Sequence, residues 1–131
     1  MDFTHVSPYA AQYADTLSGG IRQRAFFAMT LTQDCDYIVL DEPATYLDLN
    51  GQREFTEMIL QLKKQGKTVI LVLHDLAQAL KISDMLVVMQ DRKIAATAAP
   101  QECLQQHIIE DVFDVHIKEF SDDDGHYYFF Y

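Results

Sequence analysis

The stretch Tyr37-Ile38-Val39-Leu40-Asp41-Glu42-Pro43 decides the fold class of this chain. An apolar run leads directly into two carboxylates and a proline, the pattern of a strand buried on both faces that ends in a polar loop. A second β-branched run, 68–73, ends at His74. Because a helical pattern at 50–65 lies between the two runs, the sequence predicts a parallel α/β sheet.

The segments on either side extend this α/β pattern. Residues 20–32 place apolar side chains at helical spacing, Asn50 is the expected cap of the helix over 50–65, and Gly66 is expected to end it. The remaining predicted elements are a helix over 75–82, strands over 85–89 and 93–97, helical stretches from Pro100 and over 108–114, and a hairpin of 115–120 with 126–131. Gly125 is expected in the hairpin's turn.

Composition and charge describe an acidic globular protein. The chain has 131 residues, 49% of them hydrophobic and 23% charged, which is enough for a core in one domain. A formal net charge of -10 argues against nucleic acid as a partner, because phosphate backbones need a basic surface. It does not exclude a nucleotide, since backbone N–H groups and one local cation can hold a phosphate.

The cysteines and the hydropathy restrict the compartment. Cys35 and Cys103 show no metal-ligand spacing, so we expect reduced thiols of a cytosolic protein. The start of the chain lacks a signal-peptide pattern. No apolar run reaches the roughly 20 residues that span a bilayer. Any link to a membrane is therefore expected to run through a partner.

Asp41, Glu42 and His74 fall where ligands bind to parallel sheets, outside the carboxyl ends of the strands. Paired carboxylates suit Mg²⁺, which one of them holds together with waters and nucleotide phosphates. The second can orient or deprotonate an attacking water, and the histidine can donate to a γ-phosphate. The alternatives are two solvated acids before a turn and a histidine that packs at a strand end.

Leu17-Ser18-Gly19-Gly20 immediately precedes the predicted helix over 20–32. A helix start offers free N–H groups and a positive dipole end, and glycines let the backbone approach an anion. The motif is therefore a candidate phosphate contact. An ordinary Ser/Gly helix start is the alternative.

In this order, the motifs of the chain resemble those of ABC-type ATPases, from Asp15 to about Phe113. They are Leu17-Ser18-Gly19-Gly20 (signature motif), Arg22-Gln23-Arg24-Ala25, Leu40-Asp41-Glu42-Pro43 (Walker B), Leu47-Asp48 (D-loop) and Leu73-His74-Asp75 (switch histidine). Ile21 departs from the family, which usually has glutamine there.

The resemblance implies ATP and Mg²⁺ as ligands and a role for each motif. Asp41 would help hold Mg²⁺, Glu42 would polarise the attacking water and His74 would contact the γ-phosphate. The stretch Leu17-Ser18-Gly19-Gly20 would face the ATP bound to the opposite subunit. Asp48 would lie at the interface of the ATPase dimer.

Three stretches resemble one branch of that family, which drives import of iron-siderophores, haem or cobalamin: Thr45-Tyr46-Leu47-Asp48-Leu49-Asn50, Leu73-His74-Asp75-Leu76 and Ser83-Asp84. The implied partners are a second ATPase subunit, forming a homodimer in the complete protein, and a membrane permease. The implied location is cytoplasmic, peripheral to the inner face of the cell membrane. Tyr46 has an equal alternative as a packing residue beside the loop.

The sequence contains no phosphate-cradling loop of the form G-x-x-x-x-G-K-[ST]. The nearest match, Gly66-Lys67-Thr68, has Gln61 at the first glycine position, follows a helix and precedes a strand, the reverse of the required context. We interpret Gly66 as a helix cap and Lys67 as solvated. The resemblance therefore indicates a partial P-loop NTPase fold, with parallel core strands and a C-terminal hairpin, whose N-terminal half is missing.

In that interpretation the chain is one partial domain. Residues 1–33 are the end of the helical subdomain, 34–114 part of the catalytic core and 115–131 the hairpin. We expect negligible ATP hydrolysis by this chain alone, and exposed strand edges predict self-association. Three functions remain open: a fragment of an importer ATPase, a non-catalytic module that pairs with a complete ATPase or a permease, and a soluble ABC ATPase.

Overall fold

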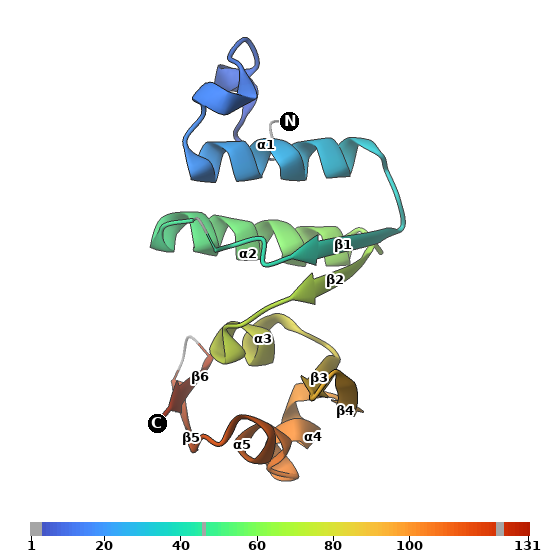
Figure 1. Cartoon of the computed structure of the whole chain (residues 1–131), viewed down its shortest axis with the longest axis vertical. Helices are drawn as coiled ribbons and strands as arrows, with labels where there is room; N and C mark the ends of the chain where they lie inside the picture. Colours follow the sequence, from blue (N-terminus) through green and yellow to red (C-terminus); the bar gives the residue numbers. More distant parts are fainter. Residues whose placement is uncertain (1–3, 46, 123–124) are drawn as a thin grey trace. The chain divides into compact units, whose positions relative to one another are not determined.

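A computed structural model of the chain describes residues 4–45, 47–122 and 125–131. Its contacts divide into two compact units, Met1–Val72 and Leu73–Tyr131, and each has its own core. Figure 1 shows the helices and strands of each unit. The predicted divisions at 33/34 and 114/115, which concern subdomains of the family, remain predictions. Among the described residues, no helix combines the length and the apolar character needed to cross a membrane.

The first unit is built around a parallel strand pair joined by a helix. Its elements are the 3₁₀ helices Ser7–Tyr9 and Ala14–Thr16, helix α1 (Gly19–Thr32), strand β1 (Tyr37–Asp41), helix α2 (Leu49–Lys64) and strand β2 (Thr68–Val72). β1 and β2 run parallel in a register from Tyr37 opposite Thr68 to Asp41 opposite Val72. The predicted parallel α/β arrangement is confirmed.

One face of this strand pair is buried and the other is exposed. Seven residues form the buried core: Phe27, Ile38, Ala44, Phe55, Met58, Ile59 and Leu62. Ile38 is 4% exposed, whereas Val39 is 64%, Ile70 50% and Val72 50% exposed. The prediction of a strand buried on both faces is therefore wrong for β1. The reason is that successive side chains of a strand point to opposite faces, and the described residues cover only one of them.

The N-cap of helix α2 lies two residues earlier than expected. Asp48, not Asn50, is its N-cap, and the Asp48 carboxylate accepts a hydrogen bond of 2.8 Å from the Gly51 backbone N–H. Asn50 lies within the first turn, where its side-chain amide donates to the Glu54 carboxylate at 2.8 Å. Both residue types can cap, but the extended backbone of Asp48 gives it the capping position.

The end of α2 matches the prediction for Gly66 but not for Lys67. Gly66 has φ +82°, its N–H donates to the Lys63 carbonyl at 2.9 Å, and the Lys67 N–H donates to the Leu62 carbonyl at 3.1 Å. This pair of bonds is the glycine C-cap that closes many helices. The Lys67 ammonium is not solvated: its side chain is 19% exposed, and Nζ lies 2.9 Å from the Asp34 carboxylate.

The second unit consists of helices and antiparallel hairpins. Its elements are helix α3 (Leu76–Ile82), strands β3 (Leu86–Gln90) and β4 (Lys93–Ala98), helices α4 (Pro100–Gln105) and α5 (Ile108–Phe113), and strands β5 (Ile117–Asp122) and β6 (Gly125–Phe130). β3 pairs with β4 and β5 with β6, all antiparallel. Four buried residues, Val88, Ala98, Cys103 and Ile109, form its core.

The two hairpins of the second unit have different residues at their turns. The C-terminal hairpin is present, and Gly125 pairs with Asp122 as the first residue of β6, next to the turn. In the β3–β4 turn, Asp91 and Arg92 have φ values of +51° and +63°. Two left-handed residues match the twist of a hairpin, and Arg92 adopts this conformation although glycine would do so at lower cost.

Candidate functional site

The stretch Leu17-Ser18-Gly19-Gly20 lies at the start of α1, as predicted. Ser18 is the N-cap, and its hydroxyl oxygen accepts from the Ile21 backbone N–H at 3.4 Å. A hydroxyl that accepts in this way keeps its own hydrogen for donation. Ser18 and Gly19 are exposed. A 14-residue helix thus presents its positive end and an available donor to solvent.

The two carboxylates lie where β1 ends. Asp41 is its last residue, and the Glu42 N–H donates to the Val72 carbonyl at 3.0 Å, which continues the ladder by one bond. Glu42 has φ +43°, an uncommon left-handed conformation for a residue with a side chain. The Thr45 hydroxyl donates to the Glu42 carboxylate at 3.2 Å. Both acids are exposed, so a cation or a water can reach them.

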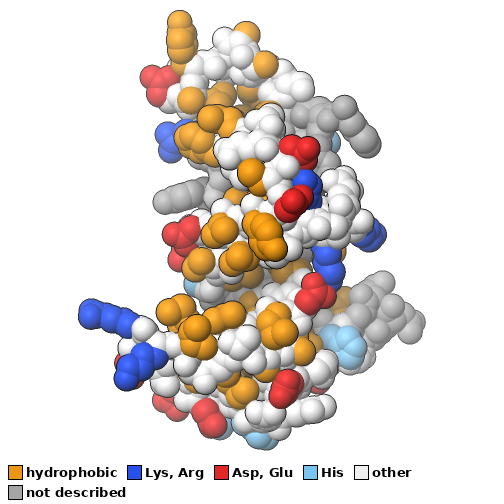
Figure 2. Space-filling view, turned by 90° about the vertical axis from the view of Figure 1, so that its right-hand side faces the viewer, with side chains coloured by type: hydrophobic (Ala, Val, Ile, Leu, Met, Phe, Trp, Pro, Cys, Tyr) orange, Lys and Arg blue, Asp and Glu red, His pale blue; other side chains and the backbone are white. Residues whose placement is uncertain are grey.

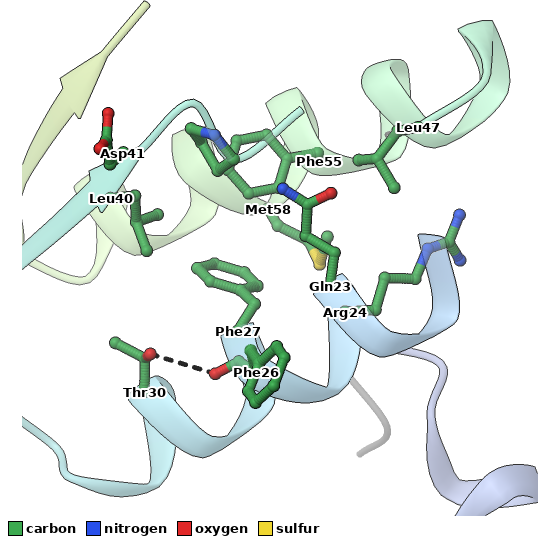
Figure 3. Close-up of a pocket in the computed structure, with 11 residues that line it drawn as sticks. Gln23, Arg24, Phe26, Phe27, Thr30, Leu40, Asp41, Leu47, Phe55 and Met58 are labelled. Carbon is green, nitrogen blue, oxygen red and sulfur yellow. Dashed lines mark hydrogen bonds between the residues drawn. The ribbon is translucent and has the colours of Figure 1, made fainter. Parts of the chain in front are cut away.

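A largely apolar pocket of about 230 Å³ lies between α1, the end of β1 and α2 (Figure 3). Its lining consists of Gln23, Arg24, Phe26, Phe27, Thr30, Leu40, Asp41, Pro43, Leu47, Phe55 and Met58. The Phe27 and Phe55 rings, 5.3 Å apart between centroids, hold the two helices together. The pocket therefore separates the helix that carries Ser18 from the strand that carries Asp41.

An ion pair joins the two helices beside this pocket. Arg24 of α1 lies 2.9 Å from the Glu54 carboxylate of α2, and both side chains are largely buried. A Cβ at Gly51 would lie 3.3 Å from the Arg24 guanidinium and 3.0 Å from the Asp48 carboxylate. Glycine inside a helix costs about 1 kcal/mol relative to alanine, but here it admits the arginine. The pair thus ties α1 to the turn that follows Asp48.

Gln23 makes a contact that sequence reasoning missed. Its side-chain N–H donates to the backbone carbonyl of Glu42 at 3.4 Å, across 19 residues of sequence. Figure 3 shows Gln23 and Arg24 side by side on α1. Both belong to the Arg22–Ala25 stretch, which resembles the family but carries no predicted role. No local periodicity distinguishes them, because their partners are distant in sequence.

The remaining predicted residues lie elsewhere. His74 belongs to the second unit, is exposed, and precedes Asp75, whose carboxylate caps α3 by accepting from the Gln78 N–H at 3.0 Å. Tyr46 lies outside the described residues. The structure therefore brings Ser18, Asp41, Glu42 and Asp48 into one unit and describes His74 in the other.

The donor set at the end of β1 fits Mg²⁺ only in combination with other ligands. Within the described ranges, no group of three or more His, Cys, Asp or Glu side chains is arranged to hold a metal. Mg²⁺ is commonly bound through one or two carboxylates, with waters and substrate phosphates completing its shell. The exposed Asp41 carboxylate suits that role, so the residues fit a magnesium–nucleotide complex rather than a metal held by protein alone.

Similar proteins with described roles are ATP-binding components of siderophore import systems. The chain is 42% identical over 111 residues to the petrobactin import ATP-binding protein FpuD of Bacillus anthracis, covering 84% of this chain and 41% of that protein. It is 40% identical over 114 residues to the ferric enterobactin transport ATP-binding protein FepC of Escherichia coli, covering 86% and 42%. The chain thus spans about two fifths of the length of these relatives.

Solved structures share the fold. One described as an inward-facing metal-chelate type ABC transporter superposes with a TM-score of 0.85 at 21% identity, covering 99% of this chain and 53% of the other. A dimeric bacterial ABC transporter cassette superposes with a TM-score of 0.69 at 23% identity, covering 75% and 43%. No protein-family profile matches the chain.

The relatives and the shared fold identify the chain as part of an ABC-type ATP-binding cassette, and they are consistent with a C-terminal piece of one. The resemblance noted in its motifs and the predicted fold class are thereby confirmed. Relatives of the chain are named for petrobactin, achromobactin and enterobactin.

Proposed function

We propose that the chain supplies the signature and Walker B parts of an ATP-binding subunit that drives import of siderophore-bound iron. The observation that carries this proposal is the joint presence, in one unit, of Ser18 at the exposed start of α1 and of Asp41 and Glu42 at the end of β1. Homology to siderophore importers adds the transported class. Haem and cobalamin are the alternatives that the motifs alone left open.

Each motif residue has a role in this proposal. Asp41 helps to hold Mg²⁺, which when bound neutralises charge on the nucleotide's phosphates. The Glu42 carboxylate, oriented by Thr45, positions the attacking water and accepts its proton. Leu17-Ser18-Gly19-Gly20 faces the ATP of the opposite subunit through the start of α1. His74 contacts the γ-phosphate.

The partners follow from the same proposal. A second ATPase subunit contacts this one at an interface that includes Asp48. A membrane permease is the other partner. The location is the cytoplasmic face of the cell membrane. Support comes from the similar dimeric cassette and from the importer names of the relatives.

The test uses the polypeptide that carries this sequence in its source cells, purified with its membrane partner. Glu42→Gln should lower ATP turnover by about 100-fold or more, because a positioned general base contributes on the order of 10² to 10⁴, while ATP binding persists. The matched control is Glu57→Gln, an exposed carboxylate on α2 that pairs with Arg53. Turnover that survives Glu42→Gln would overturn the proposal.

The same preparation identifies the transported class. In vesicles, ATP-dependent uptake should be seen with a ferric siderophore and should exceed uptake of haem or cobalamin. Uptake confined to cobalamin or haem would assign the chain to another importer of this branch.

A non-catalytic module is the second candidate, because the chain lacks a G-x-x-x-x-G-K-[ST] loop. In that case the 131-residue species itself is the cellular product and binds a complete ATPase through the start of α1. An intact mass near 15.1 kDa from source cells, with no turnover, would favour this candidate.

A further inference from the structure

The contact between Gln23 and Glu42 joins the two proposed halves of the site within one chain. The Gln23 amide nitrogen donates to the Glu42 carbonyl at 3.4 Å, a long bond by the usual range of about 2.7–3.2 Å. Long bonds of this kind in ligand-free sites often tighten in the reacting complex. A shift of a few tenths of an ångström at Gln23 would therefore strengthen or break this bond.

The carbonyl that receives this bond belongs to a strained turn. Glu42 has φ +43°, and such conformations are unfavourable for a residue with a side chain and persist where surrounding bonds hold them. Two donors reach the Glu42 carbonyl, the Gln23 amide at 3.4 Å and the Thr45 N–H at 3.3 Å. The Thr45 hydroxyl holds the carboxylate end at 3.2 Å. Gln23 is thus a donor to this turn that comes from α1.

The orientation of the Gln23 amide is determined by this contact. Exchanging its nitrogen and oxygen would set two acceptors against each other. In the described part of the chain, the Gln23 side-chain oxygen is buried and has no hydrogen-bond partner. A buried acceptor without a partner is unfavourable, and an exception of this kind in a folded protein calls for an explanation.

Gln23 lies on the same helix as the proposed phosphate contact. It lies one turn beyond Gly19 and Gly20 on α1, and residues three to four apart share a helix face. Arg24 on the same helix is tied to Glu54 at 2.9 Å, and Phe27 packs against Phe55. These contacts let α1 transmit a small displacement of its first turn as a unit.

We propose that Gln23 is a positioning residue for the Glu42 turn. When an ATP held by the facing subunit binds at the Ser18–Gly20 end of α1, Gln23 fixes the position of this turn. That ATP thereby regulates hydrolysis at the site that Glu42 serves. This inference rests on the proposed function of Glu42. Gln23 touches neither nucleotide nor water in it; it acts through the Glu42 carbonyl.

The test compares variants of the complete subunit with its membrane partner. Gln23→Met keeps the side-chain length and removes the donor. It should lower kcat for ATP about fivefold, the effect of one ordinary hydrogen bond, with KM for ATP and the thermal midpoint unchanged. Gln23→Lys restores an N–H donor and should return kcat to within about twofold. Gln61→Met, an exposed glutamine on α2, is the control.

A double variant separates positioning from a structural role. Because Gln23 acts through Glu42, adding Gln23→Met to Glu42→Gln should lower the residual rate no further. Unchanged kcat in Gln23→Met, or a fivefold loss that multiplies with Glu42→Gln, would overturn the inference and leave the proposed function intact. Turnover that survives Glu42→Gln itself would instead remove the proposed function.

Discussion

Two glycine-containing stretches of the first unit resemble phosphate-binding loops, and the structure places them at opposite kinds of helix end. Ser18-Gly19-Gly20 starts α1, where backbone N–H groups are free and the dipole is positive. Gly66-Lys67 ends α2, where the glycine closes the helix and the lysine is paired with Asp34. Similar residue types therefore form an exposed helix start in one stretch and a helix C-cap in the other.

The lysine makes the contrast sharper. A phosphate site needs a cation that is available, but the Lys67 ammonium lies 2.9 Å from Asp34 and 3.6 Å from Asp36. The Thr68 N–H donates to the Asp36 carbonyl at 2.8 Å as β2 begins. These contacts connect the end of α2 to the residues that precede β1. The end of α2 therefore stabilises the fold, and its lysine is not available to a phosphate.

The largest effect should come from placing a carboxylate at the start of α1. Gly19→Asp in the complete subunit should lower ATP turnover more than about 100-fold, because two anions would meet where one is bound. The fold should be retained, since an acidic residue in the first turn stabilises a helix by about 0.3–1 kcal/mol. Measuring turnover beside thermal unfolding, with Lys67→Ala as a control that keeps turnover, tests this. Full activity in Gly19→Asp would show that the start of α1 is not a phosphate contact.

A smaller effect is expected at the other helix end, on stability alone. Gly66 has φ +82°, and a left-handed conformation costs residues with a side chain roughly 1–2 kcal/mol. Gly66→Ala should therefore lower the free energy of unfolding by about 1 kcal/mol in urea denaturation without changing turnover. Gly66→Asn should lose less, because asparagine visits this conformation more readily. Equal losses for the two variants would show that backbone strain is not the cause.

The smallest effect concerns the pH dependence of the Lys67 pair. The hydrogen bond from Lys67 lowers the pKa of Asp34 below its ordinary value of 3.8, and the bond to Asp34 raises the pKa of Lys67 above 10.5. The contribution of Asp34 is present above pH 3.8 and is lost as pH falls through its lowered pKa. The contribution of Lys67 is present below pH 10.5 and is lost as pH rises through its raised pKa.

The measurement is the denaturation midpoint of the chain and of Lys67→Met across that range. The difference between the two proteins should be constant between about pH 5 and 9 and should shrink in acid below pH 3.8. Lys64→Met, an exposed lysine in the last turn of α2, is the control. A difference that persists unchanged at low pH would assign the effect of Lys67 to its alkyl chain.

The exposed face of the β1–β2 pair is a separate consequence of the fold. Tyr37, Val39, Ile70 and Val72 are each at least half exposed. Figure 2 shows hydrophobic side chains at the surface on one face of the molecule. Monomeric proteins rarely leave large contiguous apolar areas open. The self-association expected from the sequence remains a prediction, which sedimentation of the 131-residue chain would test.

The sequence by itself determined the features that depend on neighbouring residues. The strand, helix, strand order around Asp41, the helix start at Ser18 and the helix end at Gly66 all follow from periodicity and local backbone chemistry. The same local patterns were sufficient to indicate the protein class. The sequence did not identify Asp48 rather than Asn50 as the cap of α2, because both side chains can cap and only the backbone conformation distinguishes them.

Only the tertiary structure decided the contacts between residues far apart in the chain. The Gln23 bond to Glu42, the Arg24 pair with Glu54 and the Lys67 pair with Asp34 join residues 19 to 33 positions apart. Exposure of Val39 likewise depends on what covers each face of the strand pair. Local patterns carry no record of such partners, because folding brings them together only when the helices and strands pack.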